Sequence, residues 1–111
     1  MDSLKNKSFK DLEEMVLAIA EKFFFAKGIH DLQNENRLAE SDFCEDSPYD
    51  SYLLKVQEAY ESLCEADRNL INNEFFYQGY SQWWKPLYSK ATFYRYKKEA
   101  MQKFLGVFYH D

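Results

Sequence analysis

Glycine, proline and cysteine are scarce in this sequence, which has three glycines, two prolines and two cysteines among 111 residues. Because strand-and-turn proteins draw heavily on glycine and proline, this scarcity argues against such a fold. Hydrophobic residues make up 46% of the chain and aromatic residues 19%, which is ample for one buried core. We therefore expect residues 1–111 to form one all-α domain, a small bundle of about five helices.

Long apolar runs are also missing. A membrane-spanning helix needs roughly 20 consecutive apolar residues. The longest candidate, Met15–Ala26, is interrupted by Glu21 and Lys22. The stretch Met1–Lys7 lacks the hydrophobic centre of a secretion signal. We expect a cytoplasmic protein with no membrane partner.

Metal ligands and catalytic motifs are few. Cys44 and Cys64 have no closely spaced partner, and His30 and His110 are distant from both in the sequence. A zinc site needs four converging ligands, so we expect no metal site and two reduced thiols. There is no glycine-rich phosphate loop and no paired nucleophile and base. We therefore expect no cofactor and no enzymatic activity.

Charge is divided unevenly along the chain. The formal net charge is −5, but residues 1–66 carry −8 and residues 67–111 carry +3. Six bases and one acid lie between Lys85 and Lys103. Since salt screens exposed charges beyond about 8 Å, a phosphate near this segment responds to its local positive charge. The acidic total therefore does not exclude nucleic-acid binding.

The N-terminal half predicts one helix followed by a connection. Ser8 is suited to cap a helix over residues 8–27, and Gly28 to end it. Its apolar stripe has helical spacing and comprises Phe9, Leu12, Val16, Ile19, Ala20 and Phe23. The side chains of Phe23–Phe25 point in different directions around the helix. This favours a helix that is covered on two sides within the domain over a helix that exposes a partner surface. Residues 28–47 carry many acids and read as a solvated connection.

Residues 48–111 predict a helical unit with several short elements. Ser47 and Pro48 form a helix start, and apolar residues at helical spacing follow as far as Leu63. A third helix is expected over residues 66–77, with Leu70, Ile71 and Phe75 inward. A short element over residues 81–85 precedes Pro86.

The last predicted helix, over residues 89–108, is basic and aromatic. Ser89 is its expected N-cap, because the serine hydroxyl can accept from a free amide of the first turn. One side is apolar and comprises Phe93, Tyr96, Ala100, Phe104 and Val107. Arg95, Lys98 and Gln102 fall on the other side. The pattern predicts a basic solvent-facing surface.

Four segments, Val56–Leu63, Asp67–Ile71, Glu74–Tyr77 and Tyr88–Ala100, together resemble the helix-turn-helix of bacterial sigma factor region 4. The similarity is closest to the sigma-like phage late-transcription activators of the ArpU type and to small uncharacterised mollicute proteins. It covers about the last half of the chain. The resemblance implies a transcription regulator or accessory factor that binds double-stranded DNA through its last helix.

The resemblance also implies roles for individual residues. Those expected to approach the DNA groove are Ser89, Lys90, Ala91, Tyr94 and Arg95. Lys97 and Lys98 would neutralise phosphates. Arginine can bond two guanine acceptors at once, and lysine supplies a salt-dependent attraction. If the protein forms a homodimer, its two-fold symmetry sets the spacing of the DNA half-sites.

The sequence departs from this pattern just before the last helix. Only seven residues separate Ser81 from Ser89, and Pro86 among them cannot donate an amide. Trp83 and Trp84 stand where smaller residues would let two helices approach. These departures leave open an alternative, a protein-interaction module that docks on RNA polymerase or another transcription protein through Trp83 or Trp84 without reading DNA.

Overall fold

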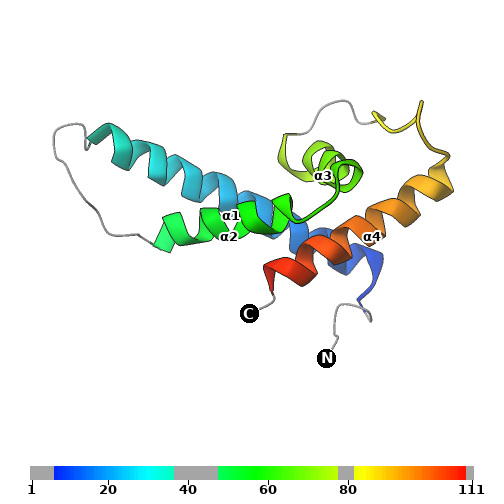
Figure 1. Ribbon diagram of the computed structural model, residues 1–111, viewed down its shortest axis with the longest axis horizontal. Coiled ribbons are helices and arrows are strands. Elements are labelled where there is room, and N and C mark those ends of the chain that lie inside the picture. Colours follow the sequence, from blue (N-terminus) through cyan, green and yellow to red (C-terminus); the bar gives the residue numbers. More distant parts are fainter. Residues whose placement is uncertain (1–6, 37–47, 78–81, 110–111) are drawn as a thin grey trace.

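The protein is described by a computed structural model that covers residues 7–36, 48–77 and 82–109. Within these ranges it contains four α-helices, α1 (Phe9–Asn36), α2 (Pro48–Glu61), α3 (Glu65–Ile71) and α4 (Lys90–Phe108) (Figure 1). A π-helical segment, η3 (Asn72–Phe76), continues α3. The all-α prediction is confirmed, with four α-helices instead of about five. None of the described helices is long and apolar enough to cross a membrane.

Helix α1 begins as its sequence predicts but runs further. The Ser8 hydroxyl accepts a hydrogen bond from the Asp11 amide at 3.1 Å, which caps the first turn. The expected stripe is largely buried, with Leu12, Val16, Ile19 and Ala20 in the core. Gly28 does not end the helix, which continues to Asn36.

The extension of α1 corrects two predictions. A glycine ends a helix when it adopts a positive φ, and the described glycines have none. Gly28 therefore costs the helix some stability without breaking it. The predicted acidic connection over residues 28–47 is wrong for residues 28–36, which are helical. Residues 37–47, including the expected N-cap Ser47, lie outside the described ranges.

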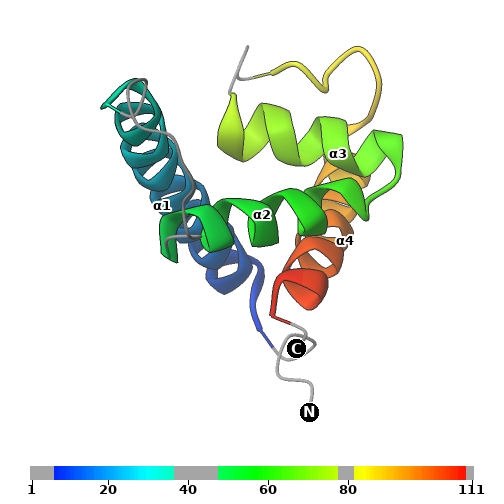
Figure 2. The same cartoon turned by 60° about the vertical axis from the view of Figure 1, so that its left-hand side comes forward.

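Helix α2 lies beside α1, and its first residue is Pro48 as predicted (Figures 1 and 2). The Tyr52 hydroxyl donates to the Ile19 carbonyl at 3.3 Å, which links the two helices. The same ring meets Phe108 of α4 edge to face at 5.7 Å. Tyr52 therefore joins three helices at one end of the core.

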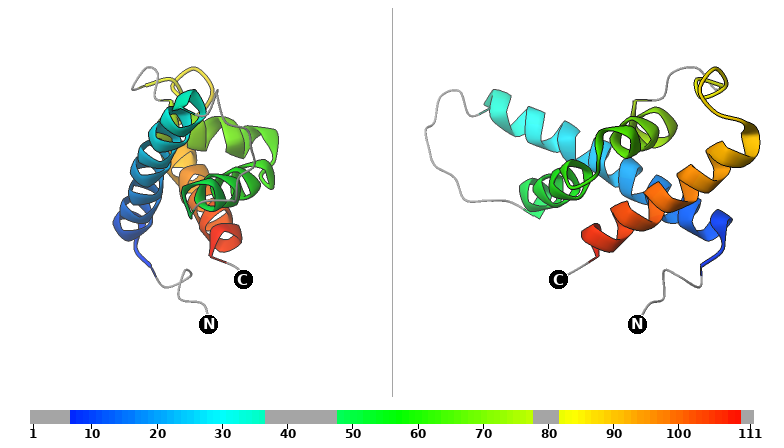
Figure 3. Two further views of the ribbon diagram at one scale, coloured as in Figure 1. Left: turned by 90° about the vertical axis from the view of Figure 1, so that its left-hand side faces the viewer. Right: turned by 45° about the vertical axis from the view of Figure 1, so that its right-hand side comes forward.

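The third helix is composite. Leu70, Ile71 and Phe75 are buried as predicted. The helix changes from α to π geometry at Asn72, and the Tyr77 amide donates to the Asn72 carbonyl at 2.9 Å, a spacing of five residues. Helix α4 crosses α1 and α2 and also packs against α3 (Figure 3). It contributes the largest share of the core, namely Phe93, Ala100, Met101, Phe104, Leu105 and Phe108.

Candidate nucleic-acid interface

The N-terminus of α4 is held by the predicted cap. The Ser89 hydroxyl accepts a hydrogen bond from the Thr92 amide at 3.2 Å. The Ser89 carbonyl accepts one from the Phe93 amide at 2.8 Å. The Ser89 hydroxyl thus satisfies one donor that a helix start would otherwise leave open, and the Ser89 carbonyl accepts the first bond of the helix.

The exposed face of α4 carries most of the residues expected to contact DNA. Ser89, Lys90, Ala91, Tyr94, Arg95 and Lys98 are all exposed. Ala91, Arg95 and Lys98 share one side of the helix because they are spaced by four and three residues. Tyr94 is also in edge-to-face contact with Phe9 at 5.5 Å, so the start of α1 supports this end of α4.

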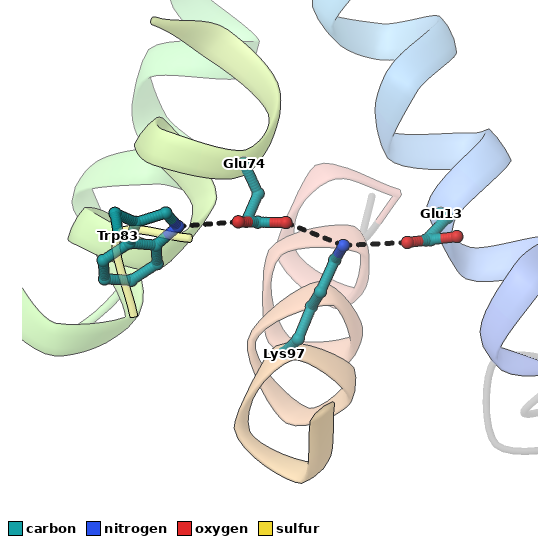
Figure 4. Close-up of polar contacts among 4 residues, drawn as sticks. All are labelled: Glu13, Glu74, Trp83 and Lys97. Carbon is teal, nitrogen blue, oxygen red and sulfur yellow. Dashed lines mark hydrogen bonds and ion pairs between the residues drawn. The ribbon is translucent and has the colours of Figure 1, made fainter. Parts of the chain in front are cut away.

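Lys97 is the exception, and its expected phosphate contact is wrong. It is only 7% exposed and lies within the core stripe of α4. Its Nζ forms ion pairs at 2.8 Å with Glu13 of α1 and at 2.8 Å with Glu74 of η3 (Figure 4). A lysine held by two carboxylates inside the molecule cannot reach a phosphate of bound DNA. Lys97 therefore connects three helical elements.

The charge of Lys97 is maintained by its partners. Burial acts to lower the pKa of Lys97, but the hydrogen bonds and the attraction of Glu13 and Glu74 outweigh it, so this pKa is raised above 10.5. The ammonium also lies 5.3 Å from the centre of the Phe75 ring and 5.6 Å from that of Phe9. The sequence does not predict the roles of Glu13 and Glu74, because Lys97 lies 84 and 23 residues away from them along the chain.

The two tryptophans pack against the same ring of α4. Trp83 donates through Nε1 to Glu74 at 2.6 Å and meets Phe93 edge to face at 5.9 Å. Trp84 stacks on Phe93, with ring centres 4.5 Å apart and an interplanar angle of 9°. Both are half-buried. Their expected role in partner binding stays a prediction.

The short element expected over residues 81–85 is a series of turns in its described part. Residues 82–87 form turns, with the Lys85 amide bonded to the Gln82 carbonyl and the Leu87 amide to the Trp84 carbonyl. The helical element before α4 in the described part of the chain ends at Phe76. A helix-turn-helix joins its helices by a turn of about three or four residues. The described residues do not show that unit.

A cleft of about 660 Å³ opens at the start of α4, between this helix and the turns of residues 82–87. Its lining includes Trp84, Lys85, Tyr88, Ser89, Lys90 and Tyr94. Four of these were predicted to bind DNA or a partner, namely Trp84, Ser89, Lys90 and Tyr94. Lys85 and Tyr88 were not singled out, although Lys85 belongs to the basic segment. The structure thus divides the predicted residues between this cleft and the outward face of α4.

Internal ion pairs reduce the basic charge that is available to a ligand. Lys103 pairs with Asp67 at 3.2 Å, and the hydrogen bond that its ammonium donates to this carboxylate raises the pKa of Lys103. With Lys97 also paired, four bases of the segment remain: Lys85, Lys90, Arg95 and Lys98. Among the described residues, no carboxylate forms an ion pair with any of these four. They are the charges that could meet a polyanion.

A second hollow lies on another part of the molecule. An apolar groove of about 320 Å³ runs between α1, α2 and η3, and its lining includes Phe23, Leu53, Tyr60, Phe76 and Tyr77. Phe25 of α1 does not line this groove and is 60% exposed. The expectation that the Phe23–Phe25 run is covered on two sides is therefore wrong for Phe25.

The described residues contain no group of three or more His, Cys, Asp or Glu side chains placed to hold a metal ion. Comparisons with protein-family models, with curated proteins and with solved structures found no match to this chain.

Proposed function

We propose that this protein binds double-stranded DNA through the exposed bases of α4 and acts as a transcription regulator or accessory transcription factor. The observation that carries this proposal is the set of exposed cations in the N-terminal half of α4. Lys90, Arg95 and Lys98 are exposed there and form no ion pair with a described carboxylate. The role in transcription comes from the resemblance to sigma factor region 4.

The chemistry of these residues suits a DNA backbone. Phosphate contacts from lysine and arginine supply most of the affinity of many DNA-binding proteins. Arg95 also carries the planar group that bonds a guanine edge in the major groove. The Ser89 cap and the contact between Tyr94 and Phe9 hold this end of the helix in place before DNA arrives. A fixed helix loses less conformational entropy on binding.

The proposal is tested by fluorescence anisotropy of a labelled random duplex at low salt. A double variant, Arg95→Gln with Lys98→Gln, should weaken binding by about tenfold or more, because two phosphate contacts are lost. The matched control is Lys27→Gln with Lys55→Gln, which removes two exposed cations from α1 and α2 and lowers the net charge equally. Equal weakening by both double variants would contradict a specific role for α4.

Docking to a transcription protein is the second candidate, and the apolar groove favours it. Tyr77 lines this groove and is 58% exposed. Tyr77→Glu should then reduce binding to purified RNA polymerase of the source organism, whereas Leu87→Glu, at an exposed position outside the groove, should not. Unchanged polymerase binding by Tyr77→Glu would rule out this groove as the docking surface.

A further inference from the structure

The cleft at the start of α4 has an aromatic wall that is fixed by ring contacts. Trp84 is stacked on Phe93, and Tyr88 meets Tyr96 edge to face at 5.2 Å. Tyr94 meets Phe93 edge to face at 5.3 Å. Trp84, Tyr88 and Tyr94 line the cleft and keep part of their surface exposed. The rings are therefore positioned in advance for a flat ligand.

The same cleft is positively charged. Lys85 and Lys90 line it, and both are exposed. Lys85 has one long contact, at 3.4 Å from its Nζ to the Gln82 side-chain oxygen. Glu74 also lines the cleft, but its carboxylate accepts hydrogen bonds from Trp83 and from Lys97. Lys97 shares its ammonium between Glu74 and Glu13, so these three groups sum to one negative charge. The two exposed lysines of the cleft, Lys85 and Lys90, outweigh that charge.

A flat aromatic ligand that carries an anion fits these features. Nucleobases stack on aromatic side chains, and lysines attract the phosphates between them. A volume of about 660 Å³ is within the range of small-ligand pockets. The bases of an intact duplex are covered by their neighbours, so a base must be unpaired before it can stack on a protein ring.

We propose that this cleft binds an unpaired nucleobase with its phosphate, presented by a single strand of nucleic acid. The inference rests on the proposed nucleic-acid function of α4 and extends it by naming a second, single-stranded ligand. The base stacks against Trp84, Tyr88 or Tyr94, and Lys85 and Lys90 contact the flanking phosphates. The outward face with Arg95 and Lys98 remains available for duplex DNA.

Tryptophan fluorescence tests the proposal directly. The chain has two tryptophans, and both lie in the segment that borders the cleft. Titration with oligothymidylate should quench their emission as bases stack on the cleft wall. The double variant Lys85→Gln with Lys90→Gln should weaken this binding by about tenfold or more at low salt. Lys27→Gln with Lys55→Gln should weaken it much less.

Comparing duplex binding with single-strand binding separates this inference from the proposed function. Arg95→Gln with Lys98→Gln should weaken duplex binding while oligothymidylate still quenches the tryptophans. Duplex binding by the wild type without quenching by the single strand would overturn the cleft proposal and leave the duplex function standing. An unchanged affinity for oligothymidylate in the Lys85→Gln, Lys90→Gln variant would also overturn it. If free thymidine monophosphate bound as tightly as oligothymidylate, the ligand of the cleft would be a free nucleotide and not a single strand.

Discussion

Lys97 illustrates how one residue can be assigned wrongly from charge alone. It belongs to the basic segment by composition, yet it occupies the middle of a buried stripe with Phe93, Ala100 and Phe104 at spacings of four, three and four residues. The helical spacing therefore indicates a buried position for Lys97, whereas the charge count alone suggests an exposed one. Its partner Glu13 lies 84 residues away, and no local pattern predicts that contact. The positions of Lys90, Arg95 and Lys98 on the surface follow from local spacing and were correct.

Replacing Lys97 should be costly. Lys97→Met keeps the length of the side chain but leaves two carboxylates without their cation, one of them with its side chain only 15% exposed. We expect the free energy of unfolding in urea to fall by about 3 kcal/mol, the low end for a broken buried pair because the Glu13 side chain is 33% exposed. Lys98→Met, on the exposed face, should change it by less than about 0.5 kcal/mol.

A second change separates charge from packing at this site. Adding Glu13→Gln to Lys97→Met removes one of the two carboxylates that lose the Lys97 ammonium. We expect the pair of changes to recover part of the lost stability, because like charges no longer face each other. No recovery would mean that packing, and not charge, accounts for the role of Lys97.

Tyr52 should make stability depend on alkaline pH. Burial, with a smaller contribution from Tyr109, raises the pKa of Tyr52 from 10.0 to about 12. The folded state therefore holds this proton more tightly than the unfolded state. Its contribution to stability is complete below pH 10.0 and is lost as the pH rises to about 12. In urea unfolding across this interval, Tyr52→Phe should lose less stability than the wild type, and parallel losses would contradict the assignment.

At the scale of the element, the helix starts were easier to predict than the helix ends. Ser8 and Ser89 cap their helices through contacts three residues away, so the sequence contains all that the caps require. Gly28 was misread, because glycine ends a helix only when tertiary structure lets it leave the helical conformation. The π geometry of η3 was also missed, since no residue type marks it.

Gly28→Ala provides a test of the longer α1. An alanine Cβ at this position would meet no heavy atom within 4 Å, and the residue lies within a continuous helix. We expect the variant to raise the unfolding free energy by about 0.5 to 1 kcal/mol. Gly106→Ala in α4, where the Cβ also meets nothing within 4 Å, should give a similar gain. A loss of stability in Gly28→Ala alone would indicate that α1 ends at Gly28.

At the scale of the whole molecule, folding redistributes the charge that the sequence displays. Glu13, from the acidic N-terminal half, forms an ion pair with Lys97, and Asp67 forms one with Lys103. Only part of the basic segment therefore remains available to a ligand. The cleft likewise combines η3, the turns of residues 82–87 and α4. Its aromatic and basic residues were visible in the sequence, but their convergence depends on long-range packing that no single segment specifies.

The salt dependence of duplex binding tests the central claim most directly. Three exposed bases of α4, Lys90, Arg95 and Lys98, form no ion pair with a described carboxylate. If all or most of these three bases release counterions, a plot of log K against log salt for a random duplex should have a slope of about −2 to −3. A slope near zero, or no binding at low salt, would contradict DNA binding by α4.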